Sequence, residues 1–364
     1  SQPLNIGLHN IHLLAQTHYK VSWKADGLRL MLLIVGQGSI YLVDRDFKFF
    51  PVGSKISFWH QEDLTQHLTN TILDGEMVMD KVQVSANQYS TSSSVDQGAT
   101  GSVVNTIPRY LIYDIVVLND KLVGNLDFIK RLEIIDHEIV RPRQKLISLK
   151  KLDRQAELFG VRAKPFYDIE MSERLLSQKF QQSLSHSIDG LIYQNVNQPY
   201  YVGKNELQLK WKPFDKNTLD FLLKIVVVSG PGKVPKKRAK LFLTGNSRIN
   251  ASSGLKNHSN LMHFSDMAYS KDLEQYENKI IECKWDFKNN TWQIIQVRKD
   301  KSHPNNILVA TNIIELLKNP LMEQNLFEFI EKKGFRPISG KTSNMNEGAK
   351  MWQNDHNQLS SHRY

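Results

Sequence analysis

The sequence predicts an α+β fold in two domains, and three observations support this prediction. The chain has 364 residues, which is enough to build two separate hydrophobic cores. Strand-like runs joined by short polar turns dominate the sequence, beginning with the strand–turn–strand of residues 19–35. Apolar residues at helical spacing occupy a few segments, among them 127–140 and 307–331. Since strands joined by tight turns pair antiparallel, we expect antiparallel sheets with helices packed against them.

The composition limits the classes of protein to which the chain can belong. No apolar run approaches the ~20 residues that a membrane helix needs, so we expect no membrane partner. The single cysteine, Cys283, excludes an intrachain disulfide and a thiolate zinc cluster, and it favours a reducing compartment. The net charge of +10 favours polyanionic partners such as nucleotides, nucleic acid or a phosphorylated tail. Because the chain begins with Ser and has no signal-like stretch, we expect a piece of a longer protein.

We assign residues 1–216 to the first domain. Its expected elements are strands at 19–24, 28–35, 40–43, 75–80, 109–118, 189–194 and 207–214, and helices near 63–70, 127–140 and 172–184. Residues 85–106 are rich in Ser, Thr, Asn and Gln and lie between two predicted strands. We therefore expect this segment to be a mobile insertion at the tip of a hairpin.

The second domain spans residues 217–304. From Leu219 onward, short strands recur at regular spacing in FLLKIVVV, AKLFLT, NKIIECKWDF and TWQIIQVRKD, which predicts a small β-barrel of the OB-fold type. Residues 305–333 are expected to form helices that pack back on the first domain, and 334–364 a disordered polar tail. The basic stretch PGKVPKKRAK at 231–240 is either a solvated loop or a surface that contacts RNA or another partner.

The stretch VSWKADGLR at 21–29 is the main candidate for chemistry. Lys24 stands where a predicted strand ends, and Asp26, Gly27 and Arg29 follow it. A lysine amine attacks a phosphorus or carbonyl centre only when it is neutral, and both burial and neighbouring cations favour the neutral form. By itself the stretch is equally compatible with a surface lysine beside an Asp-Gly turn.

Five further clusters stand at or near predicted strand ends. They are Asp74-Gly75-Glu76, Tyr113-Asp114, Asp189-Gly190, Lys210-Trp211-Lys212 and Arg298-Lys299-Asp300-Lys301. Each alone has a plainer interpretation, such as a turn, a core tyrosine or a solvent-facing lysine. Burying an acidic side chain inside an apolar strand costs free energy unless a partner compensates its charge. The first cluster, Asp74-Gly75-Glu76, is therefore a candidate for a functional role. The specific signal is the ordered set K-x-D-G-x-R, D-G-E, Y-D, D-G, K-x-K and R-x-D-K.

This ordered set resembles the covalent nucleotidyltransferase superfamily of mRNA capping enzymes and polynucleotide ligases. Within it, the chain is most similar to the guanylyltransferase domain of metazoan-type mRNA capping enzymes. The resemblance covers residues 10–333 and is carried by YKVSWKADG, LDGEM, PRYLIYDI, DGLIYQ, LKWKP, KIIECK and DKSHPN. It implies a nucleotidyltransferase domain of the ligase and capping type followed by an OB-fold domain. It also implies an mRNA guanylyltransferase, which transfers GMP from GTP to the 5′-diphosphate end of RNA.

The resemblance further implies roles for single residues. Lys24 is the nucleophile that forms lysyl-GMP, and Asp189 holds Mg²⁺ or Mn²⁺. Tyr113 stacks on guanine, and Lys164 is a candidate for reading the base. The residues expected to bind GTP are Arg29, Arg45, Asp74, Gly75, Glu76, Tyr113, Lys164, Lys210, Trp211, Lys212, Arg298, Lys299, Asp300 and Lys301.

Two other functions stay open at this point. The first is an ATP-dependent polynucleotide ligase, against which the phrases KWKP and DKSHPN argue, although spacing does not reveal the choice of base. The second is a non-catalytic RNA-binding module, against which the intact Lys24 and the intact cations argue. The resemblance implies GTP and 5′-diphosphate RNA as partners, phosphorylated C-terminal repeats of RNA polymerase II as a further partner, and the nucleus as location.

Overall fold

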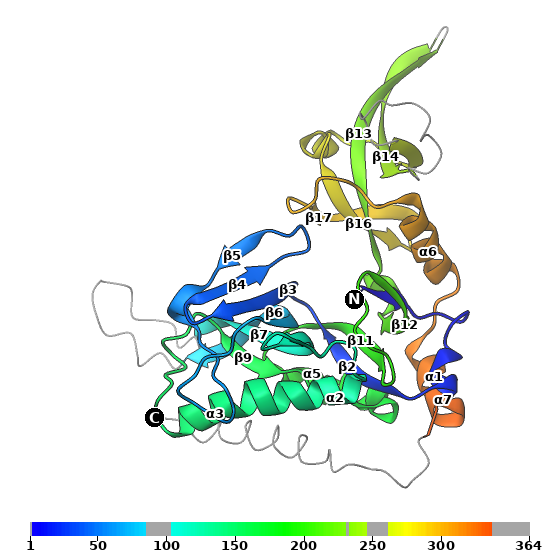
Figure 1. Cartoon of the computed structure of the whole chain (residues 1–364). Coiled ribbons are helices and arrows are strands. Elements are labelled where there is room, and N and C mark those ends of the chain that lie inside the picture. The colour runs from blue at the N-terminus through cyan, green and yellow to red at the C-terminus, as the bar shows by residue number, and fades with distance from the viewer. Residues whose placement is uncertain (1, 85–102, 231–232, 246–260, 337–364) are drawn as a thin grey trace, which may run out of the picture. The chain divides into compact units, whose positions relative to one another are not determined.

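The computed structural model describes residues 2–84, 103–230, 233–245 and 261–336, and the chain forms two compact units (Figure 1). The first unit comprises Ser1–Ile6, Asn10–Trp211 and Leu326–Tyr364, and the second comprises Gly7–His9 and Lys212–Asn325. Within the described part of the chain, no helix combines the length and the apolar character needed to cross a membrane.

The first unit contains two sheets and several short helices. Its strands are β1 (Gln2–Asn5), β2 (Tyr19–Ala25), β3 (Leu28–Gly36), β4 (Ser39–Val43), β5 (Phe49–Pro51), β6 (Thr71–Val84), β7 (Val103–Leu118), β8 (Lys121–Leu122), β9 (Gly160–Ala163), β10 (Tyr167–Asp168), β11 (Ile188–Asn195) and β12 (Lys204–Trp211). Its helices are α1 (Leu13–Gln16), α2 (Phe128–Ile134), α3 (Arg141–Ser148), α4 (Ser172–Leu176), α5 (Gln178–Ser183) and most of α7 (Glu323–Lys333).

The two sheets differ in the strands that they bring together. One has five strands in the order β1-β12-β11-β2-β10, and the other has seven, in the order β5-β4-β3-β6-β7-β8 with β9 beside β7. Adjacent strands are antiparallel except in the pairs β1–β12 and β7–β9. Antiparallel sheets combined with segregated helices confirm the predicted α+β class.

The helix of residues 128–148 covers the seven-stranded sheet. Asp127 caps it by accepting a hydrogen bond from the backbone N–H of Lys130 (2.9 Å). The predicted helix 127–140 is present, and one π-helical turn at Ile135–Val140 continues it into α3. Ile135 and Ile139 are fully buried and pack with the apolar residues of the sheet. This packing forms a hydrophobic core between the helix and the seven-stranded sheet.

Three local predictions need correction. The helix predicted at 63–70 is wrong, because the Asp63 carboxylate accepts hydrogen bonds from the N–H and hydroxyl of Thr65 and closes a turn instead. The helix predicted at 172–184 is divided at Ser177, which caps α5. Residues 103–106, predicted in the insertion, pair with β6 as part of β7. The remainder of the insertion, 85–102, lies outside the described residues, as does 337–364 of the predicted tail.

The second unit is built on one antiparallel sheet. Its elements are β13 (Thr218–Gly230), β14 (Lys233–Thr244), β15 (Leu261–Met267), β16 (Ile280–Asp286), β17 (Thr291–Val297) and α6 (Ile307–Lys318). The strand order is β15-β14-β13-β16-β17. Leu219, Phe221 and Leu241 are fully buried in its core. The strand number agrees with the predicted OB-fold, and closure of the sheet into a barrel stays a prediction.

The predicted domain limits differ from the two units at one helix. We expected residues 305–333 to pack on the first domain as a whole. Instead, Ala310 and Ile313 of α6 are buried in the core of the second unit. The chain returns to the first unit at Leu326, in α7, where Leu326 and Ile330 are buried. The apolar face of α6 therefore packs in the core of the second unit, and that of α7 packs in the first unit. The spacing of apolar residues in the sequence is helical in both segments and does not reveal this difference.

A buried ion pair anchors α2 to β7. The Arg131 side chain is fully buried, and its Nε and Nη2 donate to the two carboxylate oxygens of Asp114 at 2.6 and 3.1 Å. Its Nη1 donates to the backbone carbonyls of Leu126 and Gln198. Asp114, which belonged to one of the sequence clusters, therefore has a structural partner inside the first unit.

We expect Arg131→Ala to lower the free energy of unfolding by about 3–5 kcal/mol, because it leaves the Asp114 carboxylate buried and unpaired. Urea denaturation followed by circular dichroism measures this change. Lys130→Ala is the matched control, since the side chain of Lys130 is exposed. An effect of Arg131→Ala no larger than that of the control would contradict this account of the ion pair.

Candidate active site

Lys24 lies at the end of β2, next to the start of β11. Its Nζ donates a hydrogen bond to Asp189 Oδ2 at 2.9 Å, and the two side chains are 24% and 18% exposed. The strands pair antiparallel, with Ala25 opposite Ile188 and Trp23 opposite Leu191. The register breaks between these pairs, at the position of Asp189 and Gly190, where Gly190 has a φ of 123°. This irregularity in β11 accompanies the contact of the two charged side chains and leaves the amine partly accessible.

Asp74 is the most deeply buried carboxylate of the site, and described side chains donate four hydrogen bonds to it. Arg29 donates to both of its oxygens, from Nε at 2.9 Å and from Nη2 at 2.6 Å. The hydroxyls of Tyr113 and Tyr200 donate to the same carboxylate at 2.8 and 2.7 Å. Three of the residues predicted to bind GTP therefore form one cluster, and Tyr200 completes it.

The pKa shifts of this cluster follow from burial and charge. Burial by itself would raise the pKa of Asp74, but the hydrogen bonds and the positive charge of Arg29 hold it below its usual value. Burial and the Asp74 charge together raise the pKa of Tyr113 and of Tyr200. The carboxylate therefore stays ionised and both phenols stay protonated, which is the arrangement that keeps all four hydrogen bonds.

Glu76 and Lys164 form a second charged group beside Lys24. Burial raises the pKa of Glu76, and the positive charges of Lys164, Lys24 and Arg45 oppose that rise. Burial lowers the pKa of Lys164 to about 8, with Glu76 opposing the shift and Lys24 adding to it. The Lys164 amine also lies 5.8 Å from the ring of Trp23 and 6.0 Å from the ring of Tyr113. Both predicted guanine contacts, Tyr113 and Lys164, are thus neighbours.

Two glycines allow the strands of the site to approach closely. A Cβ on Gly27 would stand 2.4 Å from the Met77 carbonyl oxygen, so this glycine is needed for space. Its φ is not among the positive values of the described residues. A Cβ on Gly75 would stand 2.5 Å from the Tyr110 ring. Gly75 is buried, so its contribution to the site is close packing beneath the cluster and not a side-chain contact.

A further polar network holds Trp23, the residue before the nucleophile candidate. The indole N–H of Trp23 donates to His186 Nε2 at 3.1 Å. An indole N–H only donates, so His186 Nε2 must be the acceptor, and its Nδ1 carries the proton toward Asp80 at 2.9 Å. Asp80 also forms an ion pair with Arg109. This network ties β2 of the first sheet to β6 and β7 of the second.

The Lys210-Trp211-Lys212 cluster is divided in the structure. Lys210 is half-buried on β12, while the Trp211 side chain is 2% exposed and counts among the core residues. Its burial indicates that Trp211 contributes to packing, and its predicted role in GTP binding stays a prediction. Lys212 is the first residue of the second unit's main segment.

Arg298, Asp300 and Lys301 gather around Asp220 in the second unit. Arg298 donates to both oxygens of Asp300 at 2.9 and 2.7 Å and to Asp220 at 3.2 Å. Lys301 forms an ion pair with the same buried Asp220. The hydrogen bond to Arg298 lowers the pKa of Asp300 to about 2. Lys299 is exposed.

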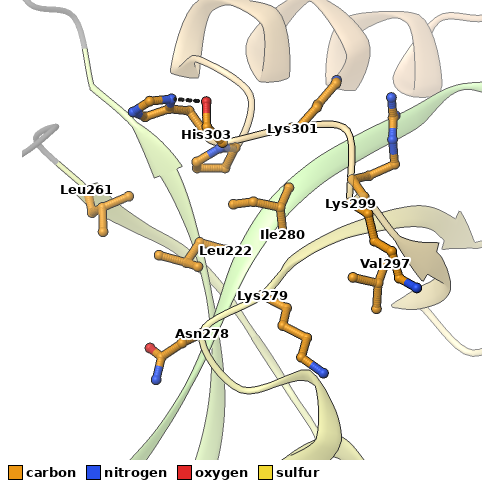
Figure 2. Close-up of a pocket in the computed structure, with 12 residues that line it drawn as sticks. Leu222, Leu261, Asn278, Lys279, Ile280, Val297, Lys299, Lys301 and His303 are labelled. Atoms are coloured by element: carbon orange, nitrogen blue, oxygen red, sulfur yellow. Dashed lines mark hydrogen bonds between the residues drawn. The ribbon is translucent and has the colours of Figure 1, made fainter.

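A pocket of about 610 Å³ opens beside this group (Figure 2). Its apolar lining includes Leu222 and Ile280, around which Lys279, Lys299 and Lys301 are arranged. Within the described residues it is therefore a cation-rimmed pocket on the second unit, suited to an anionic ligand.

The next question is which side chains of the first unit could bind the expected divalent cation. The described part of the chain has no group of three or more His, Cys, Asp or Glu side chains that would enclose a metal ion. Mg²⁺ is commonly held by one or two carboxylates while phosphate oxygens and water complete its shell. A single partly exposed carboxylate, that of Asp189, fits this second mode of binding.

The sequence identified most of these charged residues but missed several of their partners. Asp220 and Asp80 carry the signal that singled out Asp74, an acidic residue in or at the edge of an apolar strand run. Tyr200 and His186 carried no such signal, because both lie in polar segments outside the strands.

Two family models match the chain. The family model of the mRNA capping enzyme catalytic domain matches residues 1–214, and that of the mRNA capping enzyme C-terminal domain matches residues 216–327. Among solved structures, a mycobacterial DNA ligase D complexed with ATP and MES has a TM-score of 0.38 and 13% identity, covering 82% of this chain and 95% of that chain. A similarity at that level carries no argument about function.

Curated relatives are much more similar in sequence. The mRNA-capping enzymes of Danio rerio and Mus musculus are each 40% identical over 332 residues, covering 91% of this chain and 49% of the relative. That of Caenorhabditis elegans is 34% identical over 333 residues, covering 90% of this chain and 48% of the relative. The chain thus spans about half the length of the curated relatives it matches. Since the catalytic-domain model alone accounts for more than half of its residues, the chain belongs to the mRNA capping enzyme family.

Proposed function

We propose that the chain is an mRNA guanylyltransferase that works through a covalent lysyl-GMP intermediate. The observation that carries the proposal is the 2.9 Å contact between the Lys24 amine and Asp189 at the end of β2, with Glu76 and Lys164 as charged neighbours. Membership of the capping enzyme family supports the same assignment.

The reaction has two half-reactions. In the first, the neutral Lys24 amine attacks the α-phosphorus of GTP, a nitrogen–phosphorus bond forms, and the bond to the leaving pyrophosphate breaks while the amine loses a proton to solvent. In the second, a terminal oxygen of 5′-diphosphate RNA attacks the same phosphorus. The nitrogen–phosphorus bond then breaks, Lys24 recovers a proton, and the RNA carries the GpppN cap.

The neighbouring residues would bind and orient the nucleotide. Tyr113 offers a partly accessible ring for stacking on guanine, since its hydroxyl is held by Asp74. Arg29 is held by the same carboxylate and supplies a fixed positive charge. Glu76 is proposed to face the ribose, and Arg45, Lys210 and Lys212 to contact phosphate oxygens. A fixed cation stabilises the charge that spreads over the phosphate oxygens during transfer.

A divalent cation completes the proposal. Asp189 would hold Mg²⁺ or Mn²⁺ together with the phosphates of the nucleotide, and the ion would supply charge neutralisation at those oxygens. We further propose that the protein acts in the nucleus on nascent mRNA. The phosphorylated C-terminal repeats of RNA polymerase II are a proposed partner, supported by the net charge of +10.

Lys24→Ala and Lys24→Arg should both abolish the covalent nucleotide adduct. Alanine removes the amine, and a guanidinium stays protonated and cannot attack. Incubation with Mg²⁺ and α-labelled GTP, followed by denaturing electrophoresis, measures the acid-labile adduct. Lys20→Ala is the matched control, because Lys20 lies on the same strand but forms an ion pair with Asp168. Wild-type labelling in either Lys24 variant would falsify the proposed nucleophile.

Lys164→Met should raise the apparent KM for GTP and narrow the preference for GTP over ATP, because guanine presents an acceptor at O6 where adenine presents a donor. The Lys164 amine carries its charge below its pKa of about 8 and loses it as the pH rises through that value. The KM of the wild type should therefore increase above pH 8, and that increase should be absent in Lys164→Met. Adduct formation with GTP, ITP and ATP across pH 7–9 measures both effects.

Lys151→Met, at an exposed position, is the control for Lys164→Met. ITP keeps the O6 acceptor and should follow GTP in every protein. An unchanged ratio of GTP to ATP labelling in Lys164→Met would assign the reading of guanine to other groups.

Lys301→Ala should reduce adduct formation from GTP more than it reduces transfer of GMP from a preformed adduct. The reason is that we assign Arg298, Asp300 and Lys301 to the phosphates of the leaving pyrophosphate, which departs only in the first half-reaction. Single-turnover transfer from isolated adduct, set against the rate of adduct formation, separates the two steps. Lys284→Ala, at an exposed position of β16, is the control. Equal losses in both steps would contradict the assignment.

A further inference from the structure

The hairpin of β13 and β14 continues beyond the other strands of its sheet (Figure 1). β13 pairs with β16 only over residues 218–222, and β14 pairs with β15 only over residues 239–244. Among the described residues, 226–230 and 233–238 therefore pair only with each other. A two-stranded ribbon is marginally stable in isolation, and Val227 and Val234 of this one are 62% and 79% exposed. The fold gains little core from this extension.

The register places positive charges on one face of this ribbon. Ala239 and Leu241 point into the core, so the alternate positions of β14 lie on the opposite face of the sheet. Lys224 of β13 is directly opposite Lys240 and shares that face. Charges two residues apart on a strand are spaced by about 6.8 Å. We call this surface the basic face, and it consists of Lys224, Lys236, Arg238 and Lys240.

The fold uses the charges of the basic face only in part, since Lys224 lies over the Phe242 ring at 5.5 Å and Arg238 pairs with the exposed Asp266. Like charges directly opposite in a ladder destabilise it, as in the pair of Lys224 and Lys240. In the part of the chain that the structure describes, neither Lys236 nor Lys240 forms an ion pair, and Arg238 is 3.6 Å from Asp266. Lys237, on the other face, differs in being bound to Glu274 at 2.6 Å.

We propose that the basic face binds the phosphate backbone of the RNA that receives GMP. Evenly spaced cations along a strand match a polymer with a regular charge repeat better than they match a folded acidic protein. The part of the ribbon beyond the other strands, 226–238, contains no aromatic residue on which a base would stack, and the nearby Phe242 ring is covered by Lys224. We therefore expect binding to be independent of base sequence. The choice of RNA as the bound polymer rests on the proposed function. The existence of the basic face does not, because it follows from the pairing register of β13 and β14.

The basic face continues into the cation-rimmed pocket of the same unit. Leu222 lines the pocket and precedes Lys224 on the same face of β13. Lys279 and Lys299 add further positive charge on the pocket lining (Figure 2). A strand of RNA lying along the hairpin thus meets positive charge from the ribbon to the pocket, which extends the number of phosphates held.

The test compares two double variants with the same loss of charge. Lys236→Gln with Lys240→Gln removes two cations of the basic face, and Lys237→Gln with Lys271→Gln removes two exposed cations outside it. The probe is a fluorescent 5′-diphosphate RNA of about 20 nucleotides, in two unrelated sequences. Anisotropy titrations from 50 to 200 mM salt give the affinity and its salt slope. Adduct formation from GTP without RNA is measured in parallel.

The basic-face variant should bind both RNAs more weakly, with a salt slope smaller in magnitude by about 1.4, since each phosphate contact on a single strand contributes about 0.7. The control variant should keep wild-type affinity and slope, and both variants should form lysyl-GMP normally. Equal losses in the two variants, or none in either, would overturn the inference. So would a basic-face variant that binds RNA normally but loses binding of a phosphoserine peptide.

The design separates failure of this inference from failure of the proposed function. If the wild type forms no lysyl-GMP yet its RNA binding depends on Lys236 and Lys240, the guanylyltransferase proposal fails and the RNA surface stands. If the wild type labels with GTP and the basic-face variant binds RNA as well as the wild type does, the guanylyltransferase proposal stands and the RNA surface is wrong.

Discussion

The buried carboxylate of Asp74 is the constraint on which the arrangement of the first unit's site depends. A charge excluded from water must be matched by hydrogen bonds and an opposite charge, or it would be neutralised. Arg29, Tyr113 and Tyr200 meet that requirement together, and in doing so they fix one guanidinium and two phenol rings. The orientation of the groups proposed to meet the nucleotide is thus a consequence of satisfying one buried acid.

The second unit uses the same physical device. Asp220 is buried at the start of β13, and it holds Arg298 and Lys301, which in turn are separated from it by 78 and 81 residues. Both units therefore position long, flexible cationic side chains by pairing them with an aspartate in a strand. Pre-organised cations lose less conformational entropy when phosphate arrives than free ones do. This property suits a reaction in which charge develops on phosphate oxygens.

Lys24 is not positioned by a buried carboxylate. Its own contact is with Asp189, while the residue before it, Trp23, is tied through His186 to Asp80. The two interactions hold β2 from opposite sides of the strand, one at the partly exposed site and one in the interior.

The hairpin of the second unit contrasts with all of these clusters. Its cations lack buried carboxylate partners among the described residues, which is why they are available to a polyanion.

The sequence by itself determined the α+β class, the strands that carry the clusters and the amine at the end of β2. Period-two alternation and turn residues report these features directly, since they depend on neighbours along the chain. It also marked Asp74 as an acid that needs partners. Only the tertiary structure decided what those partners are, because Tyr200 is 126 residues from Asp74 and Asp189 is 165 residues from Lys24.

The same limit applies to further features of the structure. The burial of Trp211, the core that receives α6 and the structural pairing of Asp114 with Arg131 all depend on which elements meet. Local periodicity shows that a side chain has an apolar or a polar environment, and it carries no information about which distant segment supplies that environment. Pairing between distant segments is decided by packing and by the satisfaction of buried charge, which exist only in the folded chain.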